Sequence, residues 1–352
     1  MSVGTNPHLR LAVADWPGGR VLVTGASGLV GGRLVELLRH LAVPVTALVR
    51  DGRQVKRLQS LGADIAWGDV LDAGSIRRAA TGCLGVLNCA ARTNRMKTNS
   101  GDGWRVNTDG PGIVWRAAGE SGVSRVVHCS TAGVHGPLLQ WPIDEDGPLR
   151  PDSRYRRSKL EGERLLQAVA ERETGPEVVI ARPATVCGPG SGRTWRSVYH
   201  SVRRQRVLLI GPAVHPYHVT DVDDVCQGLI RCLTKPQAAG GRYFLAAAEA
   251  LPLRELLGCF AAEEGVELKA RQLPGWASAP MARLAVNTGA RIGWEPALLQ
   301  SLNFLTAPRA YHIDRARHDL DFEPAFDAPQ TIARTVAAIH DDADDLQPHA
   351  AV

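Results

Sequence analysis

The chain has 352 residues, of which 44% are hydrophobic and 22% are charged, and its formal net charge is +5. This composition is typical of a globular protein with one large or two modest domains, and the small net charge gives no indication of a nucleic-acid partner. No apolar run reaches the roughly 18 residues that a membrane span needs, and the seven cysteines have no CxxC spacing. We therefore expect a cytoplasmic protein with buried, reduced cysteines and with neither a membrane partner nor a metal site.

The first half of the chain alternates short apolar runs with helical patterns. After a leader of residues 1–18, strands are predicted at 21–24, 43–50, 63–67, 83–91, 125–130 and 177–182. Helices are predicted between them, at 29–41, 54–61, 72–80, 103–121 and 155–173. This alternation predicts an α/β fold with a doubly wound parallel Rossmann sheet, whose ligands bind beyond the carboxyl ends of the strands.

The pattern changes at Cys187. A glycine-rich loop at 188–192 precedes predicted helices at 195–205, 220–234, 252–264, within 281–305 and at 327–339, with short strands at 207–210 and 241–246. Asp327 is the expected cap of the last helix, and Asp223 and Asp224 are the expected caps of the helix near 220. The expected division is a dinucleotide-binding domain at 19–186 plus about 219–247, a smaller, mostly helical substrate domain at 187–218 plus 248–340, and a disordered acidic tail at 341–352.

Basic residues gather in three places along the chain. We expect each group to be solvated surface, with recruitment of an acidic or phosphorylated ligand as the alternative. The groups are Arg92, Arg95 and Lys97; Arg154, Arg156 and Arg157; and Arg203, Arg204 and Arg206.

A glycine-rich turn follows the first predicted strand. Gly25, Gly28 and Gly31 punctuate it, and the next predicted helix begins within it. Glycine lets the backbone approach a ligand closely, and the amide groups at a helix N-terminus favour a diphosphate. The turn therefore predicts a dinucleotide site.

A second pattern lies on the predicted helix at 155–173. Tyr155 and Lys159 are about one turn apart, so both side chains leave the same face. A lysine ammonium beside a tyrosine favours the phenolate and brings the pKa of the tyrosine toward the working range of an acid–base group. Thr131 follows the fifth strand and can supply a hydroxyl that holds a substrate oxygen.

Together these motifs resemble the extended branch of the short-chain dehydrogenase/reductase superfamily, which includes the NAD-dependent epimerases and dehydratases. Residues 24–31 are similar to its TGxxGxxG fingerprint, Tyr155 and Lys159 match its YxxxK motif, and residues 127–136 resemble its catalytic Ser/Thr segment. Matching that segment by its Val-x-Gly end places the catalytic hydroxyl on Thr131 rather than on Ser130. Further matches lie at 88–91, 107–110, 182–183, 188–189 and 222–225, so the resemblance covers about residues 20–340.

The resemblance implies a bound NAD(H) or NADP(H), a small-molecule substrate and hydride transfer between them. It implies that Tyr155 donates or accepts the proton, that Lys159 tunes Tyr155 and touches the nicotinamide ribose, and that Thr131 binds the reacting oxygen. The implied cofactor contacts are Gly25, Ser27, Gly28, Leu29, Val30, Gly31, Arg50, Asp69, Val70, Ala90, Ala91, Arg92, Asn107, Lys159, Pro183 and Thr185. The implied substrate contacts are Thr93, Ala132, His135, Val186, Trp195 and Tyr217. Many relatives pair the helices at 103–121 and 155–173 across a homodimer interface, so we expect a homodimer.

Cofactor choice depends on the end of the second strand. NAD-binding relatives usually carry an acidic residue there for the ribose hydroxyls. This chain has Arg50 in that position, followed by Arg53 and Lys56, and an arginine pairs well with a 2′-phosphate. NADP(H) is therefore favoured, and Asp51 keeps NAD(H) as the alternative.

Departures from the family pattern indicate the reaction. Sugar-nucleotide dehydratases follow their catalytic threonine with Asp-Glu, whereas Ala132 and Gly133 follow Thr131 here. Sugar epimerases carry an asparagine and an arginine for the diphosphate, and the matching positions hold Thr185 and Tyr217. Residues 182–190 look more like the 3β-hydroxysteroid dehydrogenase and dihydroflavonol-reductase-like groups.

The favoured function is therefore reduction of a ketone, or oxidation of a secondary alcohol, on a small natural-product or steroid-like substrate. The first alternative is a nucleotide-sugar epimerase with tightly bound NAD, in which Arg193, Arg196 or Arg203 would replace the missing arginine. The second alternative is a non-catalytic protein that senses the dinucleotide, and the intact Tyr155 and Lys159 count against it.

Overall fold

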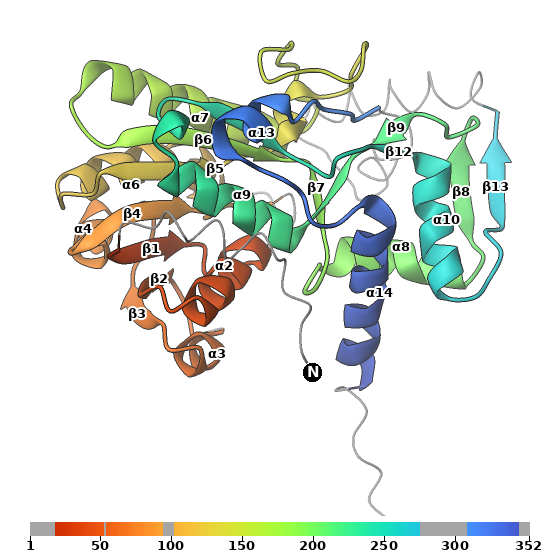
Figure 1. Ribbon diagram of the computed structural model, residues 1–352, viewed down its shortest axis with the longest axis horizontal. Coiled ribbons are helices and arrows are strands. Elements are labelled where there is room, and N and C mark those ends of the chain that lie inside the picture. Colours follow the sequence, from red (N-terminus) through yellow and green to blue (C-terminus); the bar gives the residue numbers. More distant parts are fainter. Residues whose placement is uncertain (1–17, 53, 94–101, 275–307, 345–352) are drawn as a thin grey trace, which may run out of the picture.

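The computed structural model describes residues 18–52, 54–93, 102–274 and 308–344. Seven strands form one sheet in the order β11-β6-β5-β4-β1-β2-β3, and every neighbouring pair is parallel (Figure 1). The chain moves outward in one direction from β1 to β3 and in the other from β4 to β6, so the order reverses between β1 and β4, where such sheets bind ligands. The strands are β1 (Arg20–Thr24), β2 (Val45–Val49), β3 (Asp64–Trp67), β4 (Cys83–Asn88), β5 (Arg125–Cys129), β6 (Glu177–Pro183) and β11 (Arg242–Leu245). The predicted Rossmann sheet is confirmed.

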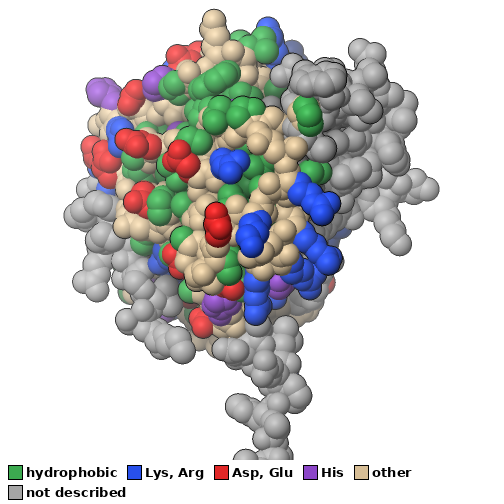
Figure 2. Space-filling view, turned by 90° about the vertical axis from the view of Figure 1, so that its right-hand side faces the viewer, with side chains coloured by type: hydrophobic (Ala, Val, Ile, Leu, Met, Phe, Trp, Pro, Cys, Tyr) green, Lys and Arg blue, Asp and Glu red, His purple; other side chains and the backbone are tan. Residues whose placement is uncertain are grey.

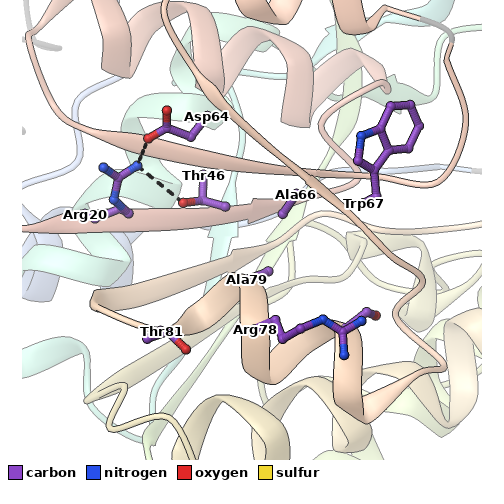
Figure 3. Close-up of a pocket in the computed structure, with 9 residues that line it drawn as sticks. Arg20, Thr46, Asp64, Ala66, Trp67, Arg78, Ala79 and Thr81 are labelled. Atoms are coloured by element: carbon purple, nitrogen blue, oxygen red, sulfur yellow. Dashed lines mark hydrogen bonds and ion pairs between the residues drawn. The ribbon is translucent and has the colours of Figure 1, made fainter.

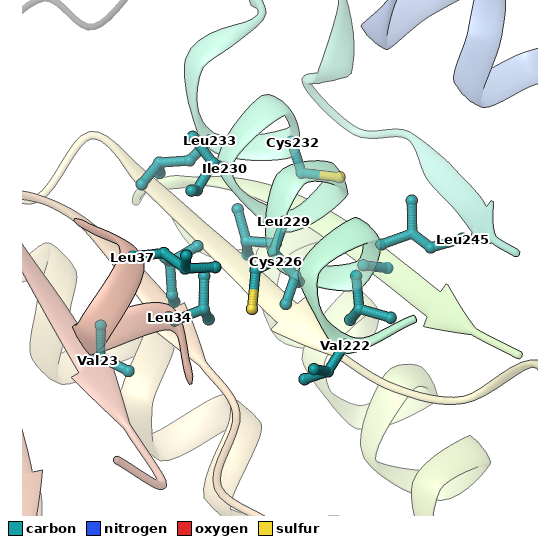
Figure 4. Close-up of a cluster of buried hydrophobic side chains, with 14 of the residues drawn as sticks. Val23, Leu34, Leu37, Val222, Cys226, Leu229, Ile230, Cys232, Leu233 and Leu245 are labelled. Atoms are coloured by element: carbon teal, nitrogen blue, oxygen red, sulfur yellow. The ribbon is translucent and has the colours of Figure 1, made fainter. Parts of the chain in front are cut away.

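Helices cover both faces of this sheet because its strands are apolar on both sides. Val21 and Val23 of β1 pack toward α2 (Leu29–His40) and α9 (Val222–Thr234), and Figure 4 shows Leu34, Leu37, Cys226 and Leu229 from these two helices meeting on that face. Leu22 points to the opposite face, in agreement with the two-residue period of a strand. The helices that cover it are α4 (Ala73–Ala80), α5 (Asp102–Thr108), α6 (Gly110–Gly119) and α7 (Arg154–Arg172).

A separate hydrophobic core lies to one side of the sheet. It joins α8 (Arg193–Arg203), α10 (Leu253–Glu263) and α14 (Ala328–Asp344), and its buried rings include Trp195, Tyr199 and Phe260. Three small two-stranded ladders accompany it: β7 (Thr185–Cys187) with β10 (Val219–Asp221), β9 (Pro216–Tyr217) with β12 (Leu251–Pro252), and β8 (Val207–Ile210) with β13 (Ala270–Leu273). The strand at 207–210 was predicted. The other five were not, and four of them have only two or three residues, which is too few to show a periodicity.

Shorter elements connect these layers. They are α3 (Val55–Ser60), α13 (Asp314–Leu320) and two 3₁₀ turns, η1 (Ala132–His135) and η2 (Pro236–Ala238). The helix predicted at 103–121 is divided into α5 and α6. The predicted leader and the predicted helices within 281–305 lie outside the described residues, apart from Gly18.

Two of the expected helix ends need correction. Asp221, rather than Asp223 or Asp224, caps α9, because its Oδ1 accepts a hydrogen bond from the Asp223 amide at 2.9 Å. Asp327 does cap α14, with its Oδ1 accepting from the Gln330 amide at 2.8 Å. This helix continues to Asp344, so the prediction that the disordered tail starts at 341 is wrong for residues 341–344.

All seven cysteines are free thiols, as expected, but only four of them are buried. Cys89, Cys129 and Cys259 are half-buried, which corrects the expectation that all are core residues. Within the described ranges, no helix is long and apolar enough to cross a membrane, and no cluster of three or more His, Cys, Asp or Glu side chains could hold a metal ion.

Candidate active site

The glycine-rich turn at the start of α2 is packed too tightly for side chains. Gly25 has a φ of +66°, and a Cβ there would lie 2.6 Å from the Cys89 carbonyl oxygen. A Cβ on Gly31 would lie 2.3 Å from the Gly25 carbonyl oxygen. Gly28 precedes α2 and has no side chain, so the cap residue supplies no side-chain hydrogen bond to the amides in the first turn of the helix. Such a cradle fits a dinucleotide diphosphate.

A pocket of about 130 Å³ lies beside this turn, at the carboxyl ends of β1, β2 and β4. Arg50 and Asp69 face each other across it, with 3.7 Å between Nη1 and Oδ2, and Asp51 also lines it. The full lining is Gly25, Ser27, Leu48, Arg50, Asp51, Gly68, Asp69, Val70, Ala90, Ala91, Arg92 and Val106. Eight of the residues predicted to contact the cofactor are therefore brought together.

Other predicted cofactor residues lie around this pocket or in packed positions. Leu29 is next to the loop at 188–192, because a Cβ on Gly190 would meet its Cδ1 at 3.4 Å. Asn107 is 2% exposed and clamps the segment after β4: its Oδ1 accepts from the Arg92 amide, and its Nδ2 donates to the Arg92 carbonyl and to Ser158 Oγ. Pro183 is buried in β6, Thr185 is half-buried in β7, and Val30 packs against the core beneath α2.

Thr131 and Tyr155 lie on two segments that pack together. Thr131 immediately precedes η1, and its Oγ1 accepts a hydrogen bond from the Gly133 amide at 3.1 Å. The Arg156 side chain covers Gly133, where a Cβ would lie 2.7 Å from Nε. Because Tyr155 and Arg156 are neighbours in the first turn of α7, this contact joins the threonine turn to the start of the tyrosine helix.

The pKa of Tyr155 is shifted in the direction opposite to the one predicted. Burial raises the pKa of its hydroxyl above the ordinary value, and a thiolate charge on Cys129 would raise it further, while Arg156 acts against both. Lys159 Nζ donates to the Cys129 carbonyl at 2.7 Å and lies 3.4 Å from His128 Nε2. Burial lowers the pKa of Lys159. The ammonium that was expected to favour the phenolate is therefore itself disfavoured by its surroundings.

A buried polar chain beneath Lys159 was not predicted. Thr24 Oγ1 lies 2.6 Å from Asn88 Oδ1, and Asn88 Nδ2 lies 3.3 Å from His128 Nδ1. The four residues Thr24, Asn88, His128 and Lys159 are at most 2% exposed. In the sequence, His128 is one polar residue within an apolar strand, and only its alternation with inward-facing neighbours could have indicated that it is buried.

Several predicted substrate residues form hydrogen bonds within the protein. The Trp195 indole donates to the Val186 carbonyl at 2.8 Å and stacks on Phe260. Tyr217 Oη accepts from Thr185 Oγ1 at 3.1 Å. Ala132 is buried in η1, Val186 is half-buried, and Thr93 is exposed.

His135 takes part in a buried network. Arg182 donates to its Nε2 at 3.1 Å, and its Nδ1 donates to the Pro148 carbonyl at 3.2 Å. Burial, together with the Arg182 charge, lowers the pKa of His135 to about 4, so the imidazole is neutral at neutral pH.

Charged residues near the start of α7 also depart from the expectation. Arg154, Arg156 and Arg157 are half-buried instead of solvated, and Arg156 pairs with Asp152. Arg309, which is 2% exposed, places its Nη2 3.6 Å from Asp152 Oδ2. Burial would raise the pKa of Asp152, but the charges of Arg156 and Arg309 outweigh it and lower that pKa.

The third basic group and a second hollow share no residue with the pocket beside the glycine turn. Arg203, Arg204 and Arg206 are exposed, as predicted, and Figure 2 shows Lys and Arg side chains gathered along one side of the face that includes α8, α10 and β8. Arg95 and Lys97 lie outside the described residues. A hollow of about 330 Å³ between β3 and α4 contains no predicted site residue, and its Arg20 and Asp64 pair with each other (Figure 3).

Residues 21–246 match the model of the NAD dependent epimerase/dehydratase family. The chain belongs to this family. It is therefore an enzyme of the extended short-chain dehydrogenase/reductase type with an NAD(P)-binding Rossmann fold.

Individual relatives carry out different reactions. The chain is 28% identical over 318 residues to the 4-hydroxy-2-methyl-3-oxo-4-farnesyl-3,4-dihydroquinoline-1-oxide ketoreductase of Stigmatella aurantiaca. The aligned residues cover 86% of this chain and 91% of that protein. The chain is also 28% identical over 337 residues to a dTDP-glucose 4,6-dehydratase of Streptomyces griseus, covering 91% and 94%. A short-chain dehydrogenase/reductase superfamily protein of Agrobacterium tumefaciens with bound NAD has the same fold, with a TM-score of 0.71, 22% identity, and coverage of 93% and 98%. Because the chain is equally identical to a reductase and to a dehydratase, sequence identity does not distinguish the two reactions, and the residues of the site have to be compared instead.

Proposed function

We propose that this protein reduces a ketone, or oxidises a secondary alcohol, on a small natural-product or steroid-like substrate. The observation that carries this proposal is the packing of the Thr131 turn against the start of α7, where the Arg156 side chain covers Gly133 and Tyr155 is the preceding residue. The bound nicotinamide cofactor supplies or accepts the hydride. Thr131 holds the substrate oxygen, Tyr155 gives that oxygen a proton in reduction or removes it in oxidation, and Lys159 supports Tyr155.

The surroundings of Thr131 argue for this reaction rather than dehydration. Water loss from a sugar needs an acid and a base beside the reacting carbon, and the family's dehydratases place them directly after the threonine. Here Ala132 has no titratable group, and the position of Gly133 is filled by the Arg156 side chain. An acidic residue at 133 would have to displace Arg156.

We further propose NADP(H) as the preferred cofactor. Arg50 extends into the pocket at the end of β2 with 45% of its side chain exposed, and Arg92 lines the same pocket. Two guanidinium groups favour a 2′-phosphate. Asp51 lines the pocket as well, and NAD(H) is therefore the competing cofactor.

We propose that the cofactor and the substrate are bound by parts of the protein with separate hydrophobic cores. The sheet and its helices hold the cofactor, and the separate core around α8, α10 and α14 forms the substrate-binding part. We also propose a homodimer that pairs α5, α6 and α7 with their counterparts, because Leu165 on α7 is a large apolar side chain with 39% exposure.

The test combines cofactor binding with turnover. Purified protein is titrated with NADPH and with NADH by fluorescence, and NADPH consumption is then screened against a panel of ketones for wild type and Tyr155→Phe. We expect NADPH to bind more tightly than NADH, and turnover to disappear in Tyr155→Phe while NADPH binding is retained. Interconversion of nucleotide sugars without ketone turnover would replace the reductase with an epimerase. Binding without any turnover would favour a dinucleotide sensor.

A further inference from the structure

Five hydrogen bonds run without interruption from a backbone amide to the amine of Lys159 and beyond. The Ala90 amide donates to Thr24 Oγ1 at 3.2 Å. From Thr24 the chain continues through Asn88 and His128 to Lys159 Nζ, and Nζ donates to the Cys129 carbonyl. The four side chains come from β1, β4, β5 and α7, and none is more than 2% exposed. Whether each side chain donates or accepts therefore depends on its neighbours in this series of hydrogen bonds.

The first links give the chain a direction. The Ala90 amide can only donate, so it occupies a lone pair of Thr24 Oγ1. The 2.6 Å separation between Thr24 Oγ1 and Asn88 is typical of O–H···O and short for N–H···O, so the hydroxyl gives its single hydrogen to Asn88 Oδ1. The amide of Asn88 then presents its NH₂ group to His128 Nδ1. This nitrogen has to accept.

The direction continues through the imidazole ring. A neutral histidine whose Nδ1 accepts carries its hydrogen on Nε2. His128 Nε2 faces Lys159 Nζ at 3.4 Å, so the ring offers a donor to the lysine. An ammonium has three hydrogens and no lone pair, whereas a neutral amine can accept one hydrogen bond and still donate to the Cys129 carbonyl.

We propose that this chain of hydrogen bonds holds Lys159 as a neutral amine in the ligand-free protein, with Asn88 and His128 as positioning residues. The inference rests on the proposed function only where it treats Lys159 as the partner of Tyr155. For Lys159 to donate to His128 as an ammonium, the His128 hydrogen would have to move from Nε2 to Nδ1. The Asn88 amide and the Thr24 hydroxyl would then have to reverse their donor and acceptor roles as well. The chain therefore links the glycine-turn strand to the charge of the lysine.

The electrostatic surroundings agree in direction. Burial lowers the pKa of Lys159, and burial is also the main reason that the pKa of His128 lies well below its ordinary value; the charge that Lys159 would carry as an ammonium would lower the pKa of His128 further. The groups that act against this on Lys159 are Cys129 at the end of β5, Glu163 on α7 and Cys89 after β4. Glu163 is paired with Arg182, which compensates its charge. The competing state is therefore an ion pair between the ammonium and a Cys129 thiolate.

The experiment reads the proton positions directly. Ligand-free protein is labelled with ¹⁵N-histidine and ¹³C-lysine, and NMR reports the tautomer of His128 and the charge of Lys159 between about pH 6 and 9. His128→Gln and Lys159→Arg assign the signals by their loss. We expect the Nε2–H tautomer throughout and an uncharged Lys159 amine at pH 8. An Nδ1–H or doubly protonated His128, or a charged Lys159 at pH 8, would overturn the proposal.

Variants test the direction of the chain. In Asn88→Asp the carboxylate can only accept, so His128 should switch to the Nδ1–H tautomer and the pKa of Lys159 should rise by about one unit or more. Asn107→Asp adds a carboxylate at a buried asparagine that is bonded to Arg92 and Ser158 instead, and it should leave the tautomer unchanged. An unchanged tautomer in Asn88→Asp, or the same switch in both variants, would contradict the proposal.

A second pair keeps the test decisive if Asn88→Asp does not fold. Thr24→Ser retains the hydroxyl and should keep the wild-type tautomer, whereas Thr24→Val removes the donor that fixes Asn88 and should lose it. Cys129→Ala removes the competing thiolate and should leave Lys159 neutral. Loss of the tautomer in Thr24→Ser, or a charged Lys159 in Cys129→Ala, would count against the chain. These measurements need no cofactor or substrate, so they stand apart from the turnover test of Tyr155→Phe.

Discussion

Glu163 and Arg182 form a two-pronged ion pair in which each side chain is only 2% exposed. Arg182 Nε and Nη2 donate to the two carboxylate oxygens at 3.1 and 2.6 Å, while Nη1 donates to the Glu145 carbonyl and to His135. Glu163 lies one turn beyond Lys159 on α7, and Arg182 lies on β6. The pair therefore fixes the helix that carries Tyr155 against the sheet.

Removing one partner of this pair should destabilise the fold strongly. Glu163→Ala leaves the Arg182 charge buried without its counter-ion, and we expect a loss of about 3–5 kcal/mol in the free energy of unfolding. Urea denaturation measures it. Glu161→Ala, at an exposed position on the same helix, is the matched control and should change this free energy by less than about 0.5 kcal/mol. Equal losses in the two variants would show that the pair is not the cause.

The same network should make stability depend on pH. Burial and Arg182 lower the pKa of His135 to about 4, whereas an unfolded histidine titrates near 6.5. Between these values the unfolded chain binds a proton that the folded protein does not. The contribution of His135 is therefore fully present above about pH 6.5 and falls as the pH drops toward 4, by about 3 kcal/mol in total.

His135→Gln isolates this effect from other groups. Burial is the main reason that the pKa of Asp224 is raised to about 7. Protonation of this carboxyl in the folded protein changes the free energy of unfolding in the opposite direction in the same pH range. Because Asp224 is common to both proteins, we compare the free energy of unfolding of wild type and His135→Gln by urea denaturation from pH 7 to pH 4. The difference between them should shrink as the pH falls. A constant difference would mean that His135 titrates normally in the folded protein.

The sequence predicts features formed by residues that are close together along the chain, but not contacts that folding makes between distant segments. The β1 strand, the glycine turn and α2 follow one another within about 20 residues, and Tyr155 and Lys159 are on one helix, so periodicity and spacing are enough to place them. The chain from Thr24 to Lys159 joins four elements, and nothing in the sequence around His128 shows that Asn88 lies beside it. The predicted direction of the Tyr155 pKa was wrong for the same reason, because burial depends on the whole site.

The glycine cradle gives a sharp prediction for cofactor binding. Gly31→Ala would place a Cβ 2.3 Å from the Gly25 carbonyl oxygen, so α2 and the turn have to move apart. We expect the affinity for NADPH and NADH to fall at least about tenfold, a cost of about 1.4 kcal/mol. Gly258→Ala is the control, because this helical glycine on α10 has no atom within 4 Å of an added Cβ. Fluorescence titration that gave the same dissociation constants for Gly31→Ala and wild type would contradict the cradle.

The proposed homodimer can be tested at Leu165. We expect light scattering after size-exclusion chromatography to give the mass of two chains at micromolar concentration. Leu165→Glu would bury a charge in the α7 interface and should shift the protein to the monomer. Leu139→Glu is the control, since this side chain is 76% exposed and lies on none of the three interface helices. A wild-type monomer, or equal dissociation in both variants, would contradict the interface.

Arg50 should decide between the two dinucleotides. Its guanidinium and the Asp69 carboxylate are 3.7 Å apart, a weak and partly exposed pair, so Arg50 is free to turn toward a ligand phosphate at little cost. A charge-assisted contact of this kind is worth about 1.5–3 kcal/mol, which corresponds to a preference for NADPH of about tenfold or more. Arg50→Asp replaces the contact with a carboxylate, which repels the 2′-phosphate and can accept from the ribose hydroxyls of NADH.

We therefore expect Arg50→Asp to erase or reverse the ratio of the NADPH and NADH dissociation constants, while Arg50→Gln weakens NADPH binding without improving NADH binding. Asp51→Asn is the matched control at the neighbouring position. If Asp51 instead of Arg50 reads the ribose, this control will weaken NADH binding while Arg50→Asp leaves the ratio unchanged. That result would assign NAD(H) to the pocket and overturn the proposed cofactor preference without affecting the proposed catalytic residues.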